Sequence, residues 1–168
     1  MTGPPGGGAP SDRAGPGPPP LRPFGLVLHR DGRFTHEGFP LVHPRLRALF
    51  ERSVRYLPDE RTYVVQVGHF RGQLEVEEAG FFVRAVDLAR GTTALSDRSE
   101  EPLDPASLRP SAHDPDALLC TVKRDLVPGG LPARFERGAQ AELLLAVEET
   151  PDGFALRLAG ELHPLPDW

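Results

Sequence analysis

A histidine and a glutamate stand side by side at positions 36 and 37, directly before the turn Gly38-Phe39-Pro40. A histidine beside a carboxylate is suited to acid–base catalysis, but hydrolysis also needs a nucleophile or a metal and an oxyanion donor. Adjacent residues on a strand point to opposite faces of the sheet, so these two side chains do not reach one substrate atom together. We therefore interpret His36 and Glu37 as polar residues at the end of a strand.

The other residue types that carry chemistry also lack the surroundings that catalysis needs. The six histidines show no spacing typical of a metal site, and no cysteine cluster supports them. Cys120 lies in the apolar run ALLCTV, which predicts a buried structural thiol rather than a nucleophile. The glycines of GPPGGG precede no Lys-Ser/Thr pair and follow no strand, so they do not form a phosphate loop. We expect no catalytic residue, no metal and no cofactor, and hence a protein that is not an enzyme.

The arginines are the remaining candidates for binding. Arg45, Arg52 and Arg55 fall on one side of a predicted helix, where they form either a solvated face or a surface for a protein partner. Arg134 and Arg137 flank a turn in the second half of the chain. If the two halves pack turn to turn, these two arginines converge with residues of the first half. Guanidinium groups there would suit a carboxylate or phosphate, and the candidate binding residues are His69, Glu77, Arg134 and Arg137.

Composition limits the class of protein and its partners. The 168 residues permit one domain or two small ones, and their formal net charge of -5 argues against a dedicated nucleic-acid binder. Residues 1–22 are dominated by proline and glycine, so we expect a disordered tail with no apolar block of a secretory signal. No apolar run is long enough to span a bilayer. One cysteine is consistent with a reducing compartment, so we expect a cytoplasmic protein.

The first half alternates between predicted strands and one helix. A hairpin is expected over residues 24–36 with its turn at Arg30-Asp31-Gly32, and Pro40 ends the pairing. Pro44 suits a helix start, Pro58-Asp59 suits its end, and apolar residues recur between them at helical spacing. Three strands are then expected over residues 63–67, 73–77 and 81–88.

The second half repeats this order after a predicted irregular connection, residues 91–115, which is rich in Ser, Asp, Pro and Arg. A strand resumes near Leu118. The segments 38–74 and 130–165 both run glycine, apolar residue, proline, apolar stripe, Pro-Asp turn and alternating strand. Residues 136–147 fit a helix by this repeat, but they also fit one arm of a hairpin turning at 150–153.

Several segments in this order resemble the domain-of-unknown-function family numbered 1285, a family of uncharacterised bacterial proteins. The relevant features are Phe34, Gly38-x-Pro40, Leu49-Phe50, the run VEEAGF at 76–81 and GGLPARFER at 129–137. The likeness covers roughly residues 24–165. It implies an α+β fold with a duplicated unit, a second half superficially like a pleckstrin-homology domain, and binding between the units in signalling. The chain departs from the family pattern at Gly80, where proline is usual, and at Glu78, where aspartate is usual.

Together these observations predict an α+β protein with two related small units, each made of antiparallel strands plus one helix. The expected division is a tail at 1–22, a first unit at 23–90, a linker at 91–115 and a second unit at 116–168. The expected function is a non-enzymatic ligand-binding or regulatory module whose cleft between the units takes a small anionic ligand. The alternative is a protein-interaction scaffold that uses a sheet edge or the arginine face of the first helix.

Overall fold

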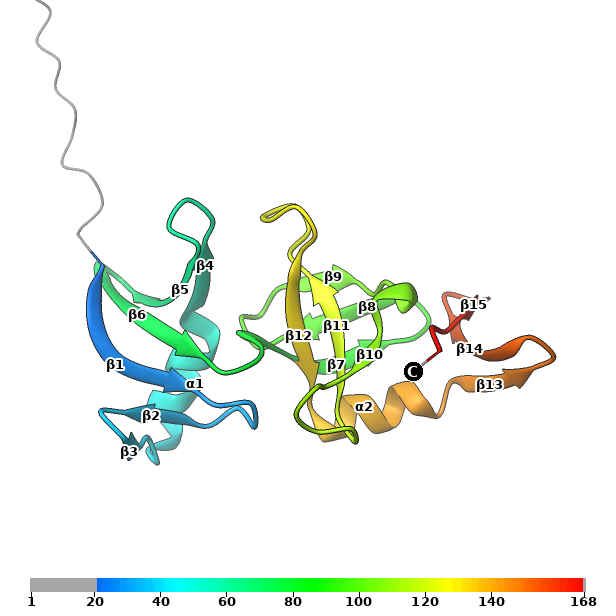
Figure 1. Cartoon of the computed structure of the whole chain (residues 1–168), viewed down its shortest axis with the longest axis horizontal. Coiled ribbons are helices and arrows are strands. Elements are labelled where there is room, and N and C mark those ends of the chain that lie inside the picture. Colours follow the sequence, from blue (N-terminus) through cyan, green and yellow to red (C-terminus); the bar gives the residue numbers. More distant parts are fainter. Residues whose placement is uncertain (1–20, 168) are drawn as a thin grey trace, which may run out of the picture.

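Two six-stranded sheets lie one after the other along the chain in residues 21–167, which the computed structural model describes, and a three-stranded sheet follows them (Figure 1). The predicted α+β class is confirmed. Most of the predicted tail, residues 1–20, lies outside the described residues, and Arg22 already belongs to the first strand.

The first sheet is built from two antiparallel three-stranded meanders joined by a parallel central pair, in the order β3-β2-β1-β6-β5-β4. The pair β1·β6 sets Leu26 opposite Leu74 and Leu28 opposite Val76. Its elements are β1 (Arg22–Leu28), β2 (Phe34–His36), β3 (Phe39–Pro40), α1 (Pro44–Ser53), β4 (Val54–Leu57), β5 (Thr62–Val67) and β6 (Phe70–Val76).

The second sheet has the same plan, with the order β10-β11-β12-β7-β8-β9 and β7·β12 as the parallel central pair. A short 3-10 helix takes the place that α1 has in the first sheet. The elements are β7 (Phe81–Asp87), β8 (Thr92–Leu95), β9 (Glu100–Pro102), η1 (Pro105–Ser107), β10 (Arg109–Pro110), β11 (Leu118–Val122) and β12 (Leu131–Phe135).

After β12 the chain adds α2 (Arg137–Leu144) and the meander β13 (Val147–Thr150), β14 (Gly153–Leu158) and β15 (Glu161–Pro164). The two predicted repeat segments do share the order helix then three antiparallel strands. The fuller correspondence, however, runs between β1–β6 and β7–β12, because these twelve strands repeat both the connections and the parallel closure.

The segment 91–115, expected to be an irregular linker, instead contains β8, β9, η1 and β10. The Asp and Ser residues that suggested a loop bind backbone N–H groups at its turns: Asp97 Oδ1 accepts from the Ser99 N–H, and Asp104 Oδ1 caps η1 at Ala106. The strand at 81–87, assigned from sequence to the first unit, is the central strand of the second sheet.

The two helices both end earlier than the sequence predicted. The first helix stops at Ser53, not near Leu57, because β-branched Val54 and aromatic Tyr56 continue as a strand paired with β5. Residues 136–147 are mostly helix, and the competing hairpin also exists: α2 ends at Leu144, and β13 and β14 turn at Pro151-Asp152.

A single hydrophobic core runs through both sheets and reaches α2 and β14. Phe34 and Phe81, one in each sheet, are both 1% exposed. Cys120 is buried in this core, as its apolar neighbours predicted. No helix within residues 21–167 is long and apolar enough to cross a membrane.

Candidate functional site: the cleft between the sheets

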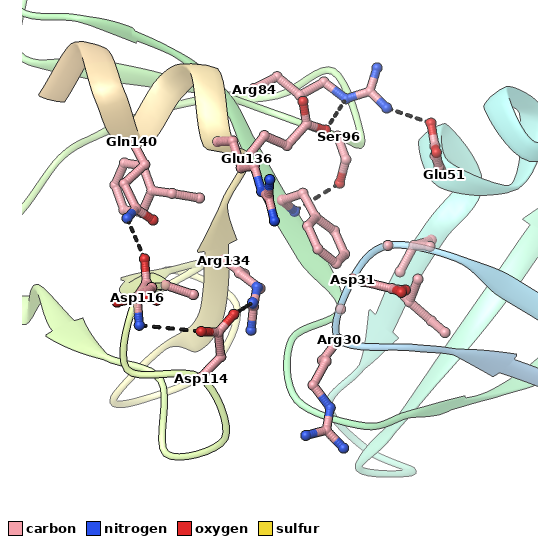
Figure 2. Close-up of a pocket in the computed structure, with 18 of the residues that line it drawn as sticks. Arg30, Asp31, Glu51, Arg84, Ser96, Asp114, Asp116, Arg134, Glu136 and Gln140 are labelled. Atoms are coloured by element: carbon pink, nitrogen blue, oxygen red, sulfur yellow. Dashed lines mark hydrogen bonds and ion pairs between the residues drawn. The ribbon is translucent and has the colours of Figure 1, made fainter.

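A cleft of about 770 Å³ separates the two sheets, and residues of both sheets line it (Figure 2). Its apolar surface comes chiefly from Leu28, Phe34 and Val54 on the first side and Phe82, Phe135 and Leu144 on the second. The charged lining residues are Arg30, Asp31, Arg47, Glu51, Arg84, Asp114, Asp116, Arg134, Glu136 and Arg137. The cleft therefore combines an apolar surface with charges of both signs.

Helix α2 presents one face to this cleft and another to the core. Ala139 and Leu143 are buried, whereas Arg137, Gln140, Ala141 and Leu144 line the cleft at the spacing of one helical face. Leu144 is 46% exposed because it faces this open space. Gln140 also braces the opposite loop: its Nε2 donates to the Asp116 carbonyl at 2.7 Å.

Arg84 on β7 bridges the two sides of the cleft. Its Nη2 donates to Glu51 of α1, and its Nε lies 3.5 Å from Oε1 of Glu136 at the start of α2 (Figure 2). Glu51, Arg84 and Glu136 form a continuous line of charge from the first sheet's helix to the second's.

Arg134, a predicted site residue, does line the cleft, but its guanidinium group already forms two ion pairs. Nη1 donates to Glu78 Oε2 and Nη2 to Asp114 Oδ2, both at 2.6 Å. Arg134 and Glu78 are both nearly buried, and Glu78 also accepts from the Ser111 hydroxyl. The guanidinium of Arg134 thus ties β12 to two neighbouring loops, so it is not a free fork for an anion.

Glu77, the next predicted residue, is held by the β1–β2 turn. Its carboxylate accepts from the Arg30 N–H at 3.0 Å and lies 2.7 Å from His29 Nδ1. These hydrogen bonds, the Arg30 N–H first, lower the pKa of Glu77 to about 2. Glu77 is not among the lining residues, although its partner Arg30 is.

The run from Glu77 to Gly80 is the junction between the two sheets. Glu77 bonds to the first sheet and Glu78 to the second. Gly80 lies under the ring of Tyr63, and a Cβ at residue 80 would stand 2.2 Å from Tyr63 Cε1. Burial raises the pKa of the Tyr63 hydroxyl to about 12. The tyrosine ring therefore occupies the space that a side chain at residue 80 would need.

His69 lies away from the other predicted residues. It belongs to the turn between β5 and β6 and lines a separate pocket of about 420 Å³ with Leu57, Pro58 and Arg71. The structure therefore brings Arg134 and Arg137 together in the cleft, with Glu77 nearby, but not His69. His36 stacks on Phe24 at a ring-centroid distance of 4.7 Å and is also not a lining residue.

One arginine and one acid of the cleft have no ion-pair partner in the described part of the chain, and a second arginine, Arg47, is only loosely paired. Within residues 21–167, neither Arg137 nor the carboxylate of Asp116 has an ion-pair partner. Arg47 Nε is buried without a hydrogen-bond partner, and the nearest acid oxygen to its Nη2, Glu51 Oε1, is 4.0 Å away. Sequence reasoning missed Arg47, Glu51 and Arg84. The i,i+4 pair Arg47–Glu51 is a local signal, but its exposure to a cleft depends on how the sheets pack.

The predicted arginine face of the first helix does not form as expected. Arg55 lies in β4, where its Nη1 donates to the Arg52 and Val54 carbonyls. Arg45 is exposed on α1, and none of Arg45, Arg52 and Arg55 lines the cleft. Among residues 21–167, no group of histidine, cysteine and acidic side chains is arranged to hold a metal ion.

No family model and no curated protein matches the sequence. Two solved structures do resemble it, and both are DUF1285 family proteins, the family that the sequence motifs resemble. The protein from Silicibacter pomeroyi DSS-3 is 20% identical, with a TM-score of 0.60 over 88% of this chain and 82% of that one. The protein from Shewanella baltica OS155 is 18% identical, with a TM-score of 0.46 over 73% of this chain and 91% of that one. At this identity, the first likeness concerns the fold alone, and it agrees with the α+β class that the resemblance implied.

Proposed function

We propose that this chain is a non-catalytic binding or regulatory module, cytoplasmic and bacterial, whose cleft between the two sheets receives a small ligand. The main observation in support of this proposal is the cleft, because both sheets supply apolar and charged residues to its lining. Ligand sites in proteins are typically concave, largely apolar and fitted with a few polar groups, and they often lie between structural units. A ligand held there would contact α1 and α2 together, which gives it a means of changing how the sheets are held.

The lining chemistry supports binding rather than catalysis. Neither a histidine nor a cysteine is among the described lining residues. The Ser96 hydroxyl is engaged by the Phe82 N–H at 3.0 Å, with no base beside it. A hydroxyl nucleophile needs an adjacent base to be activated. A role in signal transduction is the family's suggestion, and we adopt it for this chain as part of the proposal.

Blocking the cleft without touching the core tests this proposal. Ala141 is exposed and lines the cleft, so Ala141→Trp fills the space with an indole. Glu142→Trp is the matched control, because Glu142 is the next residue of α2, is also exposed and does not line the cleft. The probe is N-phenyl-1-naphthylamine, an uncharged dye whose fluorescence rises in apolar sites. We expect saturable binding to the wild type and to Glu142→Trp, and at least about tenfold weaker binding to Ala141→Trp. Equal binding by all three proteins would refute the cleft as the site.

A second candidate function is a protein-interaction scaffold, and one observation favours it. The edge strand β3 and the residues after it expose two apolar side chains, Phe39 at 76% and Val42 at 79%. Exposed apolar residues on an open sheet edge are suited to pairing with another chain. Pull-down with Phe39→Ser/Val42→Ser beside Ala141→Trp separates the two functions, because each variant removes one surface only.

A further inference from the structure

We infer that the ligand of this cleft is an organic acid with an apolar body, and that its acidic group binds at the wall of the cleft that carries Arg47 of α1 and Arg137 of α2. This inference rests on the proposed function and specifies the ligand class. It assigns a role to Arg47, and it removes Arg134 from the group of anion-binding residues.

Among the described residues, the ion pairs of the cleft leave Arg137 without a partner and Arg47 with only a long contact, 4.0 Å, to Glu51. Arg134 is matched by Glu78 and Asp114 at 2.6 Å. The other matched arginines are Arg84, with Glu51 and Glu136, and Arg30, with Glu77. An arginine already held by two carboxylates gains little from a third, whereas an unmatched one gains a charge-assisted hydrogen bond.

Arg47 carries a hydrogen-bond donor that lacks an acceptor. Its Nε is buried and unpartnered, while its Nη2 is 4.0 Å from Glu51, beyond hydrogen-bond distance. Glu51 is engaged by Arg84 instead. A buried donor without a partner is costly, so an acceptor oxygen supplied by a ligand would relieve that cost.

Arg137 offers a second hydrogen-bond donor, from the side of the cleft formed by the second sheet and α2. It is the first residue of α2, is exposed, and has no ion-pair partner within residues 21–167. The N-cap residue Glu136 makes no side-chain capping bond, so the first N–H groups of α2 also lack that partner. The positive charge of Arg137 and the helix dipole at this end of α2 both favour an anion.

The two arginines lie at the two ends of one wall of the cleft. Arg47 is one helical turn from Glu51, Glu51 pairs with Arg84, Arg84 pairs with Glu136, and Arg137 follows Glu136. Three arginines and two glutamates make up this wall, so it carries a net positive charge.

The rest of the cleft specifies the remainder of the ligand. Phe82, Phe135 and the half-exposed Leu144 offer apolar surface, which suits a hydrocarbon or aromatic body. The carboxylate of Asp116 has no ion-pair partner in the described chain and would repel a second acidic group. We therefore assign a ligand with one acidic group.

A pair of dyes with the same apolar body tests the assignment. 1-Anilinonaphthalene-8-sulfonate carries an acidic group that N-phenyl-1-naphthylamine lacks. We expect Arg47→Gln and Arg137→Gln each to weaken binding of the sulfonate dye about tenfold or more and to leave the uncharged dye within about twofold. Arg45→Gln is the matched control, because Arg45 is an exposed arginine of α1 that does not line the cleft. It should change neither affinity.

The outcomes distinguish this inference from the proposed function. If Ala141→Trp blocks the uncharged dye but both arginine variants bind the sulfonate dye normally, the acid site is wrong and the cleft remains a binding site. If Ala141→Trp blocks neither dye, the proposed function itself fails. Circular dichroism checks the fold of each variant. Should Arg47→Gln unfold, the exposed Arg137→Gln decides the inference alone, and unchanged sulfonate-dye binding in it would overturn the assignment.

Discussion

The two six-stranded sheets share one strand order, but the residue that follows the last strand of each sheet makes different contacts in the two. In each sheet a glutamate follows the last strand and donates its N–H across the parallel pair: Glu77 to the Leu28 carbonyl, and Glu136 to the Val83 carbonyl. Each glutamate also pairs with the residue after its acceptor, His29 for Glu77 and Arg84 for Glu136.

The difference lies in what these pairs reach. His29 bonds within the first sheet, to Glu77 and to the Thr35 hydroxyl. Arg84 extends out of the second sheet to Glu51 of α1. The pair His29–Glu77 therefore holds a turn of the first sheet, whereas the pair Arg84–Glu136 forms a wall of the cleft. The repeated topology provides the framework, and the cleft is formed where the copies diverge.

The largest loss of stability should follow from replacing Arg134, the arginine of the second sheet that is paired with Glu78 and Asp114. Arg134→Met leaves Glu78 nearly buried without a cation, and we expect a loss of about 3–5 kcal/mol in the free energy of unfolding. Arg137→Met should change it by less than about 0.5 kcal/mol, because Arg137 is exposed and unpaired. Urea unfolding measures both. Similar losses for the two variants would contradict the distinction between a matched and an unmatched cleft arginine.

The next largest loss of stability should follow from a substitution at Gly80, in the junction between the sheets. Gly80→Ala places a Cβ 2.2 Å from the Tyr63 ring, and overpacking of this kind costs about 1–3 kcal/mol. Gly138→Ala is the control, since a Cβ there meets nothing within 4 Å and alanine favours the helix. We expect Tyr63→Leu to rescue Gly80→Ala in thermal unfolding. A rescue that fails would mean the tyrosine ring is not what requires glycine.

A charged cluster of the second sheet should give a smaller effect that depends on pH. Lys123 Nζ bonds to Asp97 Oδ2 at 2.8 Å and lies 2.9 Å from Glu101. Burial would raise the pKa of Asp97, but the bonds from Lys123 and Ser99 outweigh it and lower that pKa.

Because the folded-state pKa of Asp97 lies below its unfolded value, its stabilisation is present above the unfolded pKa of about 3.9 and is lost as pH falls through the folded value. Asp97→Asn should cost about 1–2 kcal/mol at pH 7, and less at pH 2. Asp59→Asn, at an exposed aspartate with no ion pair in residues 21–167, is the control. A cost independent of pH would show that the lost interaction is not ionic.

The smallest effect concerns the glutamate of the first sheet. A carboxyl NMR titration should place the pKa of Glu77 at about 2, with the stabilisation from its ionised form lost as pH falls from 4.5 toward that value. His29→Leu should raise this pKa only in part, because the Arg30 N–H still donates to the carboxylate. A midpoint near 4.5 in the unmodified protein would contradict the described turn.

Sequence reasoning recovered the elements better than their assembly. The α+β class and the buried Cys120 follow from local composition and periodicity, whereas a helix over residues 136–147 was favoured only by the repeat, with a hairpin as the alternative. The strands within 91–115 could not be recognised, because such short strands, of which β9 and β10 lie at the sheet edges, are stabilised by neighbours across the sheet rather than by their own residues.

The candidate site was recovered only in part for the same reason. Arg137 was identified as a cleft residue, but the pairing of Arg134 with Glu78 spans 56 positions and depends on tertiary packing. For Arg47 the only local signal is its i,i+4 spacing from Glu51, which does not predict a binding site, since an arginine on an amphipathic helix is usually solvated. His69 was assigned to the cleft between the halves with Arg134 and Arg137, whereas in the structure it lines another pocket.

Amide chemical shifts measured while 1-anilinonaphthalene-8-sulfonate is added test the central claim most directly, because they report both sides of the cleft at once. We expect the changes to gather at Gly32 and Arg47 of the first side and at Ser96, Ala141 and Leu144 of the second. Changes confined to one side, or to exposed apolar residues elsewhere such as Phe39, Leu145 and Phe154, would contradict a ligand site between the sheets.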